Sequence, residues 1–161
     1  MPFKVLRQDG KGVIYRLAGD DVAALGVALR QVAEAHLAEL RQALEQMAVD
    51  PAKRSVIGRE ELLEQARRGE VIFIDVRPPA ECEFAHLPFP RSLPLAEIEH
   101  RLSELLRDKD IVAYCRGPFR LLSDEAVALL QAIGYRVRKI RDGVSEWQAA
   151  GMPVIAAGIA A

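Results

Sequence analysis

The chain has 161 residues and a mass of 17.8 kDa, which leaves room for one ordinary domain and an appendage rather than two full domains. Half of the residues are hydrophobic and 28% are charged, a globular composition, and the formal net charge of -1 excludes nucleic-acid binding through a generally basic surface. The two cysteines, without paired Cys or His spacing, exclude a disulfide framework and a structural zinc site, so we expect no metal and no cofactor.

Residues 1–18 predict a β-hairpin. Apolar side chains alternate along two short runs, and the turn residues Asp9-Gly10-Lys11-Gly12 separate these runs. Because an isolated hairpin is only marginally stable in water, we expect this one to pack against another part of the protein.

Residues 20–49 predict one long helix, capped by Asp20 or Asp21 and ended before Pro51. Apolar residues recur along it in steps of three and four, at Val22, Leu25, Leu29, Ala33, Leu37, Leu40, Leu44 and Met47. Such a helix is ~45 Å long, whereas a domain of the remaining ~110 residues has a radius of gyration near ~13 Å. We therefore expect a homodimer through residues 20–49; the alternative is a helix folded back on its own domain. His36 has no partner at i+4 and is expected to be a packing or interface residue.

From Ser55 onward, helices and short apolar runs alternate. The pattern predicts helices at 60–68, 95–106, 121–133 and 145–150, buried strands at 71–76 and 111–114, and a further strand at 136–140. Alternation of this kind predicts an α/β fold with a central parallel sheet and helices on both faces. We therefore expect two parts, a hairpin and helix over 1–50 and an α/β domain over 51–161. In such sheets ligands bind at the carboxyl ends of the strands, near a switch in strand order.

Cys115 directly follows one of these strands and begins the loop Cys115-Arg116-Gly117-Pro118-Phe119-Arg120, after which a helix starts. A connection from a strand to a helix directs backbone N–H groups and the positive end of the helix dipole at one point. Together with the two arginines, these groups favour a thiolate over a thiol. The loop therefore predicts a reactive, accessible nucleophile; the alternative is a buried and inert cysteine.

Residues ~55–155 resemble a rhodanese domain in five motifs that occur in the family's order. The motifs are Ile74-Asp75-Val76-Arg77, then Glu81 with His86-Leu87-Pro88, the active loop Cys115 to Arg120, Gly143-Val144-Ser145-Glu146-Trp147, and Gly151-Met152-Pro153-Val154. The resemblance implies a sulfurtransferase that carries sulfane sulfur as a persulfide on Cys115. A small anionic donor such as thiosulfate would supply the sulfur, and a thiophilic acceptor such as cyanide or a thiol would take it. Related phosphatases and arsenate reductases have one more residue between the cysteine and the arginine, so the shorter loop favours sulfur transfer.

The resemblance also implies roles for individual residues. Arg116 and Arg120 would attract the anionic donor, and the amides of the loop would stabilise the persulfide anion. Asp75 and Arg77 would brace the active-site face, and His86 would hold backbone carbonyl groups in place.

The sequence departs from the family's pattern at several positions. Ala85 and Phe89 replace glycines that are usual in the family, and Cys82 replaces an aromatic residue. Gly117 stands two residues after Cys115 instead of three, with Pro118 at the usual glycine position, so the loop shape and the substrate preference are expected to differ. We expect Cys82 to be a packed substitute for the aromatic residue; the alternative is a resolving thiol for Cys115. Trp147 is expected in the core.

The segment from Val5 to Leu17, followed by Asp20-Asp21-Val22, resembles the wing hairpin and dimerisation helix of an ArsR-type winged-helix repressor. The helices that precede the wing in that family, including the one that reads the major groove, have no counterpart here. DNA is therefore expected as a partner only if such segments precede this chain. The alternative function is a sensory part of a regulator, in which the persulfide state of Cys115 is the signal.

The N-terminus carries charges from Lys4 onward and has no apolar segment, so we expect no signal peptide. The apolar stretch from Pro153 to Ala161 is far shorter than the ~20 residues of a membrane-spanning helix. We therefore expect the protein to be cytoplasmic and to have no membrane partner.

Overall fold

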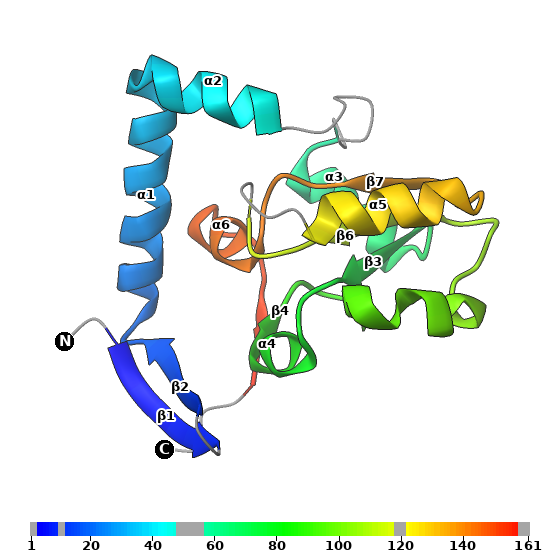
Figure 1. Ribbon diagram of the computed structural model, residues 1–161, viewed down its shortest axis with the longest axis horizontal. Coiled ribbons are helices and arrows are strands. Elements are labelled where there is room, and N and C mark those ends of the chain that lie inside the picture. The colour runs from blue at the N-terminus through cyan, green and yellow to red at the C-terminus, as the bar shows by residue number, and fades with distance from the viewer. Residues whose placement is uncertain (1–2, 10–11, 48–56, 118–121, 158–161) are drawn as a thin grey trace. The chain divides into compact units, whose positions relative to one another are not determined.

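The computed structural model describes residues 3–9, 12–47, 57–117 and 122–157 (Figure 1). The chain divides into two compact units, Met1–Ala43 and Leu44–Ala161. The division that we expected, between residues 50 and 51, falls in the segment 48–56, outside the described residues. None of the described helices has the length and apolar composition needed to cross a membrane.

The first unit begins with the predicted hairpin. Strands β1 (Phe3–Asp9) and β2 (Gly12–Leu17) pair antiparallel, with Phe3 opposite Leu17 and Asp9 opposite Gly12. The register shifts between Val5 and Arg7, as it does at a β-bulge. The hairpin is confirmed, and the two turn residues at 10 and 11 lie outside the described residues.

The prediction of a single helix over 20–49 is wrong, because two helices occupy this range. Helix α1 spans Asp20–His36 and helix α2 spans Ala38–Met47, and between them Leu37 has an extended backbone with φ −101° and ψ 103°. The N-cap of α1 is Gly19, with Asp20 and Asp21 in the first turn. Leucine is a strong helix former, so propensity gives no sign of this break. The length argument for a dimer is lost, because 17 residues of α1 span only about 26 Å.

The second unit is built on a four-stranded sheet in the order β5-β3-β6-β7, in which every neighbouring pair is parallel (Figure 1). Its strands are β3 (Val71–Asp75), β5 (Pro90–Ser92), β6 (Asp110–Tyr114) and β7 (Val137–Lys139). Its helices are α3 (Arg59–Arg67), α4 (Pro79–Phe84), α5 (Leu122–Ala132) and α6 (Val144–Ala149). The predicted α/β class with a central parallel sheet is confirmed.

Residues 95–106 differ from the predicted α-helix. They form two short 3-10 helices, η2 (Leu95–His100) and η3 (Leu102–Glu104), separated by Arg101. Arg101 leaves the helical region with φ −117° and ψ 20°. The Leu102 carbonyl accepts the Leu105 N–H of the 3-10 turn and also the Tyr135 hydroxyl, each at 3.1 Å. The sequence did not predict four elements of two to six residues, because they are too short to show a period. These are α4, β5 and the antiparallel pair β4 (Ala85–His86) with β8 (Ile155–Ala156).

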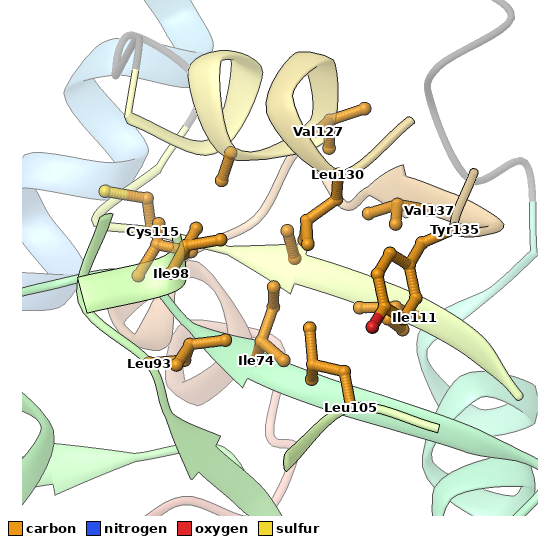
Figure 2. Close-up of a cluster of buried hydrophobic side chains, with 13 residues drawn as sticks. Ile74, Leu93, Ile98, Leu105, Ile111, Cys115, Val127, Leu130, Tyr135 and Val137 are labelled. Carbon is orange, nitrogen blue, oxygen red and sulfur yellow. The ribbon is translucent and has the colours of Figure 1, made fainter. Parts of the chain in front are cut away.

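Alternation along the strands divides the core into two layers. On β6 and just after it, Ile111, Ala113 and Cys115 point to one face of the sheet, whereas Val112 and Tyr114 point to the other. The first face is covered by α5, η2 and η3, and Figure 2 shows this cluster of hydrophobic side chains. The position of Cys115 on the α5 face therefore follows from the register of β6.

The second face is covered by α3 and α6. Trp147 of α6 is fully buried there, as predicted, with its ring 6.2 Å from that of Phe73 in an edge-on arrangement. This contact fixes α6, and with it the residues before Trp147, against the sheet.

The strand order places the carboxyl ends of β3 and β6 at a topological switch point. The chain leaves β3 toward β5 on one side and returns to the other side of β3 as β6. Helices that follow two such strands lie on opposite faces, which opens a crevice at the strand ends. Asp75 ends β3 and Cys115 follows β6, so both stand at this edge.

Phe89 stands at one of the positions where glycine is usual in the resembled family, and its φ of 58° explains that preference. A left-handed backbone costs a non-glycine residue ~1–2 kcal/mol, and the Phe89 side chain is 55% exposed, so it recovers little of this by packing. We expect Phe89→Gly to raise the Tm by about 3 °C in a thermal melt, because the strain exceeds the flexibility that glycine adds to the unfolded chain. Phe84→Gly, at a similarly exposed phenylalanine with an ordinary φ, should lower it; equal changes at both positions would contradict the explanation.

Candidate active site

Cys115 lies at the carboxyl end of β6, where the sequence placed it, but it is not accessible as expected. The residue is only 2% exposed and belongs to the α5-side core cluster. In Figure 2 its sulfur lies at the rim of this cluster and points away from the aliphatic side chains. The expectation of exposure was wrong because it rested on the polar residues that follow, whereas the alternation of β6 turns the side chain toward the sheet face.

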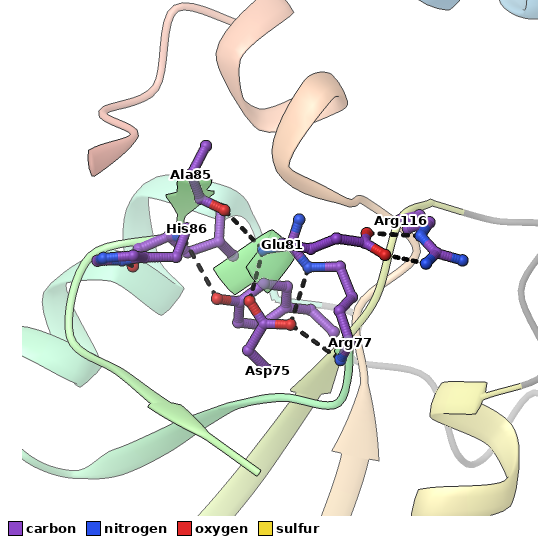
Figure 3. A network of polar contacts seen from close by, with 8 residues as sticks. Asp75, Arg77, Glu81, Ala85, His86 and Arg116 are labelled. Atoms are coloured by element: carbon purple, nitrogen blue, oxygen red, sulfur yellow. Dashed lines mark hydrogen bonds and ion pairs between the residues drawn. The ribbon is translucent and has the colours of Figure 1, made fainter. Parts of the chain in front are cut away.

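The loop after Cys115 is described as far as Gly117, and the predicted site residues Pro118, Phe119 and Arg120 lie outside the described residues. Arg116 forms a two-armed ion pair with Glu81 of α4 (Figure 3), one arm running 2.6 Å from Nε to Oε2. Bidentate arginine–carboxylate pairs fix geometry as well as charge. The guanidinium that we expected to attract the donor is therefore held by a carboxylate and ties the loop to α4.

Gly117 and Gly143 let α6 approach the loop closely. Gly117 has φ +136°, which disfavours any side chain. A Cβ on Gly143, which precedes α6, would lie 2.4 Å from the Arg116 carbonyl carbon and 2.6 Å from both the Cys115 oxygen and the Gly117 nitrogen. The backbone of the loop thus rests directly on the start of α6.

Glu146 stands behind this contact and was not predicted as a site residue. It is 5% exposed, and its Oε2 accepts the Gly143 N–H at 2.7 Å. Its other carboxylate oxygen lies 3.0 Å from the position that a Cβ on Gly117 would take. The signal in the sequence was the spacing from Gly143 to Glu146, which matches an N-cap and the N3 glutamate of a capping box.

Asp75 and Arg77 form a buried pair at the end of β3 (Figure 3). Asp75 accepts from Arg77 Nη2 at 2.5 Å and from Nε at 2.8 Å, and Nη2 also donates to the Ala85 carbonyl at 2.7 Å. The guanidinium lies 5.8 Å from the Tyr114 ring centroid. Burial, followed by the Asp75 charge, raises the pKa of Tyr114. The pair therefore joins β3, β4 and β6 at the edge of the sheet where Cys115 lies.

His86 and Cys82 lie near this pair, on the elements that follow β3. Nδ1 of His86 lies 2.9 Å from the Leu87 carbonyl oxygen, so this nitrogen carries the proton in that contact. Cys82 is 6% exposed, and burial, with Asp75 as the next cause, raises the pKa of its thiol. Both residues line a cavity of about 340 Å³, together with Pro79, Glu83, Pro90 and Ser92.

The described residues therefore bring together a cysteine at a strand end, a loop held on two sides and a buried ion pair beside it. Among them, no three His, Cys, Asp or Glu side chains gather in a group that would hold a metal ion. A cysteine in this setting is suited to nucleophilic attack and to carrying a transferred group.

Comparison with known proteins extends these observations. A family model described as the rhodanese-like domain matches residues 58–150. The chain is 39% identical over 88 residues to a sulfurtransferase of Allochromatium vinosum, which covers 54% of this chain and 80% of that protein. The crystal structure of thiosulfate sulfurtransferase from Pseudomonas aeruginosa superposes with a TM-score of 0.55 at 25% identity, over 63% of this chain and 20% of that one.

The similarity to one relative extends beyond residues 58–150. An HTH-type transcriptional regulator of Mycobacterium tuberculosis is 40% identical over 148 residues, or 92% of this chain. The chain spans 65% of the length of that relative. The similarity thus reaches into the hairpin and α1 as well as the α/β domain.

Proposed function

Since the chain belongs to the rhodanese-like domain family, we propose that it is a sulfurtransferase that carries sulfane sulfur as a persulfide on Cys115. The observation that carries the proposal is the position of Cys115, at the end of β6 beside the switch point of the sheet. The 39% identity to a protein named as a sulfurtransferase supports the reaction class. The donor is a small sulfane-sulfur compound such as thiosulfate or a persulfide, and cyanide or a thiol is the acceptor.

The reaction proceeds in two balanced steps. The Cys115 thiolate attacks the outer sulfur of the donor, a new sulfur–sulfur bond forms, and the old bond breaks with its electron pair leaving on sulfite or a thiolate. The acceptor then attacks the terminal sulfur of the persulfide and returns the Cys115 thiolate. No net oxidation or reduction of the protein accompanies a full cycle.

Mass spectrometry tests this proposal directly. After incubation with thiosulfate or a small persulfide and removal of excess donor, the peptide that contains Cys115 should carry one additional sulfur atom. Addition of cyanide should remove that atom and release thiocyanate. A Cys115 peptide that gains no sulfur from either donor would contradict the proposal.

A second candidate function is a regulatory module, favoured by the match to the HTH-type regulator over 92% of this chain. In that case the persulfide state of Cys115 is a signal transmitted to the N-terminal unit, whose hairpin and α1 resemble the wing and dimerisation helix of ArsR-type repressors. Hydrogen exchange distinguishes the two functions. A regulator should show different protection in residues 20–47 between the persulfidated and the reduced protein, whereas a simple enzyme should show none.

We also propose that the chain forms a homodimer through α1. Leu25, Leu29 and Val32 stand on one face of this helix, at i, i+4 and i+7, and are 69%, 68% and 57% exposed. Burying each such side chain contributes ~1.5–3 kcal/mol, and a twofold contact between two copies of the same face is the simplest closed arrangement. The Cys115 loop belongs to the other unit, so it lies outside the helix that we propose as the contact.

Light scattering should therefore give twice the 17.8 kDa chain mass at micromolar concentration. The double substitution Leu25→Glu with Leu29→Glu should give monomers that keep their sulfur-transfer activity, because it places charges in the contact and leaves the α/β domain intact. Leu106→Glu with Ile133→Glu is the matched control, since both residues are exposed leucine or isoleucine side chains of the other unit. A monomeric native protein would disprove the proposal.

A further inference from the structure

The chain passes from β7 to α6 through a turn at residues 140–143 (Figure 1), and the start of the active loop, residues 115–117, rests on this turn. The two ends of the turn are fixed, because Ile140 and Val144 are both buried in the core layer that α3 and α6 cover. Between them, a Cβ on Gly143 would lie 2.6 Å from the Cys115 carbonyl oxygen. A movement of this turn would therefore also move or release the backbone that carries the Cys115 side chain.

Arg59 holds Asp142 of this turn from a distant part of the sequence. Its Nε donates to Oδ2 of Asp142 at 2.5 Å, across 83 positions of the chain. Arg59 is the first residue of α3. Leu62 anchors that helix, since it is only 2% exposed and packs in the same core layer as Trp147 of α6. The ion pair therefore ties the turn to a helix that is itself fixed against the sheet.

The ion pair is partly withdrawn from water. The Asp142 side chain is 19% exposed and the Arg59 side chain 39% exposed, so their attraction is screened less than that of a pair in open solvent. A hydrogen bond between two ionised groups is also stronger than one between neutral groups. Asp142 directly precedes Gly143, and Glu146 accepts the Gly143 N–H at 2.7 Å. Both residues of the dipeptide 142–143 are therefore restrained where it meets the loop.

We propose that Arg59 is a positioning residue for sulfur transfer. Through Asp142 it keeps Gly143 against the backbone of residues 115–117, and this contact keeps the Cys115 sulfur in line with the sulfur–sulfur bond of the donor. The inference rests on the proposed sulfurtransferase function. Arg59 takes no part in the bonds that form or break in either step, and its effect comes only from where it places the backbone.

Arg59→Gln should lower kcat/KM for thiocyanate formation from thiosulfate and cyanide about tenfold, because a displacement of ~1 Å at a reacting group costs ~100-fold and the loss of one restraint gives a part of that. Asp142→Ala should give a similar fall, since it removes the other half of the ion pair. The double variant should fall no further than either single variant, because both substitutions remove the same interaction. A fall in the double variant equal to the product of the two single falls would overturn the inference.

Arg59→Lys separates the charge of the side chain from its shape. Lysine keeps a cation that can reach the carboxylate, although without the fixed geometry of the guanidinium, so kcat/KM should stay within about threefold of the native value. A fall as large as that of Arg59→Gln would mean that the arginine acts through packing and not through the ion pair, and would overturn the inference.

Arg136→Gln is the matched control. Arg136 Nε lies 2.6 Å from Oδ1 of Asp110, so the same residue types form a similar ion pair. This pair joins the start of β6 to the residue before β7, at the opposite edge of the sheet from Cys115. Its loss should leave kcat/KM at the native value, even if the Tm falls as much as in Arg59→Gln. An equal fall of kcat/KM in the two variants would show a general effect of stability and overturn the inference.

Hydrogen exchange gives a readout that needs no turnover. In Arg59→Gln the amides of residues 115–117 and of Gly143 should exchange faster than in the native protein, whereas Arg136→Gln should leave them unchanged. Native exchange rates in Arg59→Gln would overturn the inference. If the native protein releases no thiocyanate, the sulfurtransferase proposal fails, and the exchange rates still decide whether Arg59 holds the loop. Turnover by the native protein with an unchanged kcat/KM in Arg59→Gln defeats this inference alone.

Discussion

Replacing Cys115 with serine should reduce sulfur transfer to the uncatalysed background. A serine hydroxyl is not ionised near neutral pH, and its oxygen cannot carry sulfane sulfur as a persulfide, so both halves of the reaction lose their chemistry. The side chain is similar in size and sits at the end of a buried strand, so the fold should survive. Thiocyanate formation from each donor, measured against a protein-free control, gives the result.

Cys82→Ser is the matched control for that substitution. Burial raises the pKa of the Cys82 thiol, so it stays protonated and unreactive at neutral pH. We expect this variant to retain most of the native activity, because the lost thiol is neither a nucleophile nor a partner of the transferred sulfur. Equal loss of activity in the two variants would indicate a dithiol mechanism and contradict the assignment to Cys115.

The rate of alkylation as a function of pH adds a second readout. A Cys115 thiolate favoured by the loop and the following helix should titrate below the value of ~8.5 that is ordinary for a free thiol. Since Arg116 is engaged by Glu81, it contributes less to this depression than a free arginine would. An inflection at or above ~8.5 would show that Cys115 is no more acidic than a free thiol.

The sequence predicted the part of the fold that periodicity controls. Runs of β-branched residues marked β3 and β6, and the helix-to-strand alternation gave the parallel sheet, because a strand covered on both faces must be apolar throughout. Cys115 was found for the same reason: a strand that ends in a cysteine and a polar loop places that cysteine at the edge where ligands bind.

The features that the sequence did not predict depend on contacts between distant residues. The break at Leu37 has no glycine or proline to mark it. The pairing of Arg116 with Glu81 joins residues 35 positions apart, and no local pattern distinguishes it from a free cation. Likewise, the burial of Cys115 comes from the face of β6 that it occupies, and the position of Glu146 behind Gly117 comes from the closeness of α6 to the loop.

This closeness makes Gly143 the position where the smallest change should have a large effect. A methyl group there would lie 2.4–2.6 Å from three backbone atoms of residues 115–117, and backbone atoms give way less readily than a flexible side chain. The dihedral angles of Gly143, φ −102° and ψ −170°, suit alanine, so the cost is a collision and not backbone strain. Overpacking of this kind costs ~1–3 kcal/mol, and a displacement of ~1 Å at a reacting group lowers a rate by ~100-fold.

We therefore expect Gly143→Ala to lower kcat/KM for sulfur transfer by about 100-fold and to lower the Tm as well. Gly58→Ala is the matched control, because Gly58 also precedes a short helix with an extended backbone, and its Cβ would meet only Glu60 at an ordinary 3.7 Å. Its kcat/KM should stay at the native value, and its stability within ~0.5 kcal/mol of it. Steady-state kinetics and thermal melts on both variants decide the matter: a Gly143→Ala protein with native kcat/KM would mean that the loop does not depend on its contact with α6.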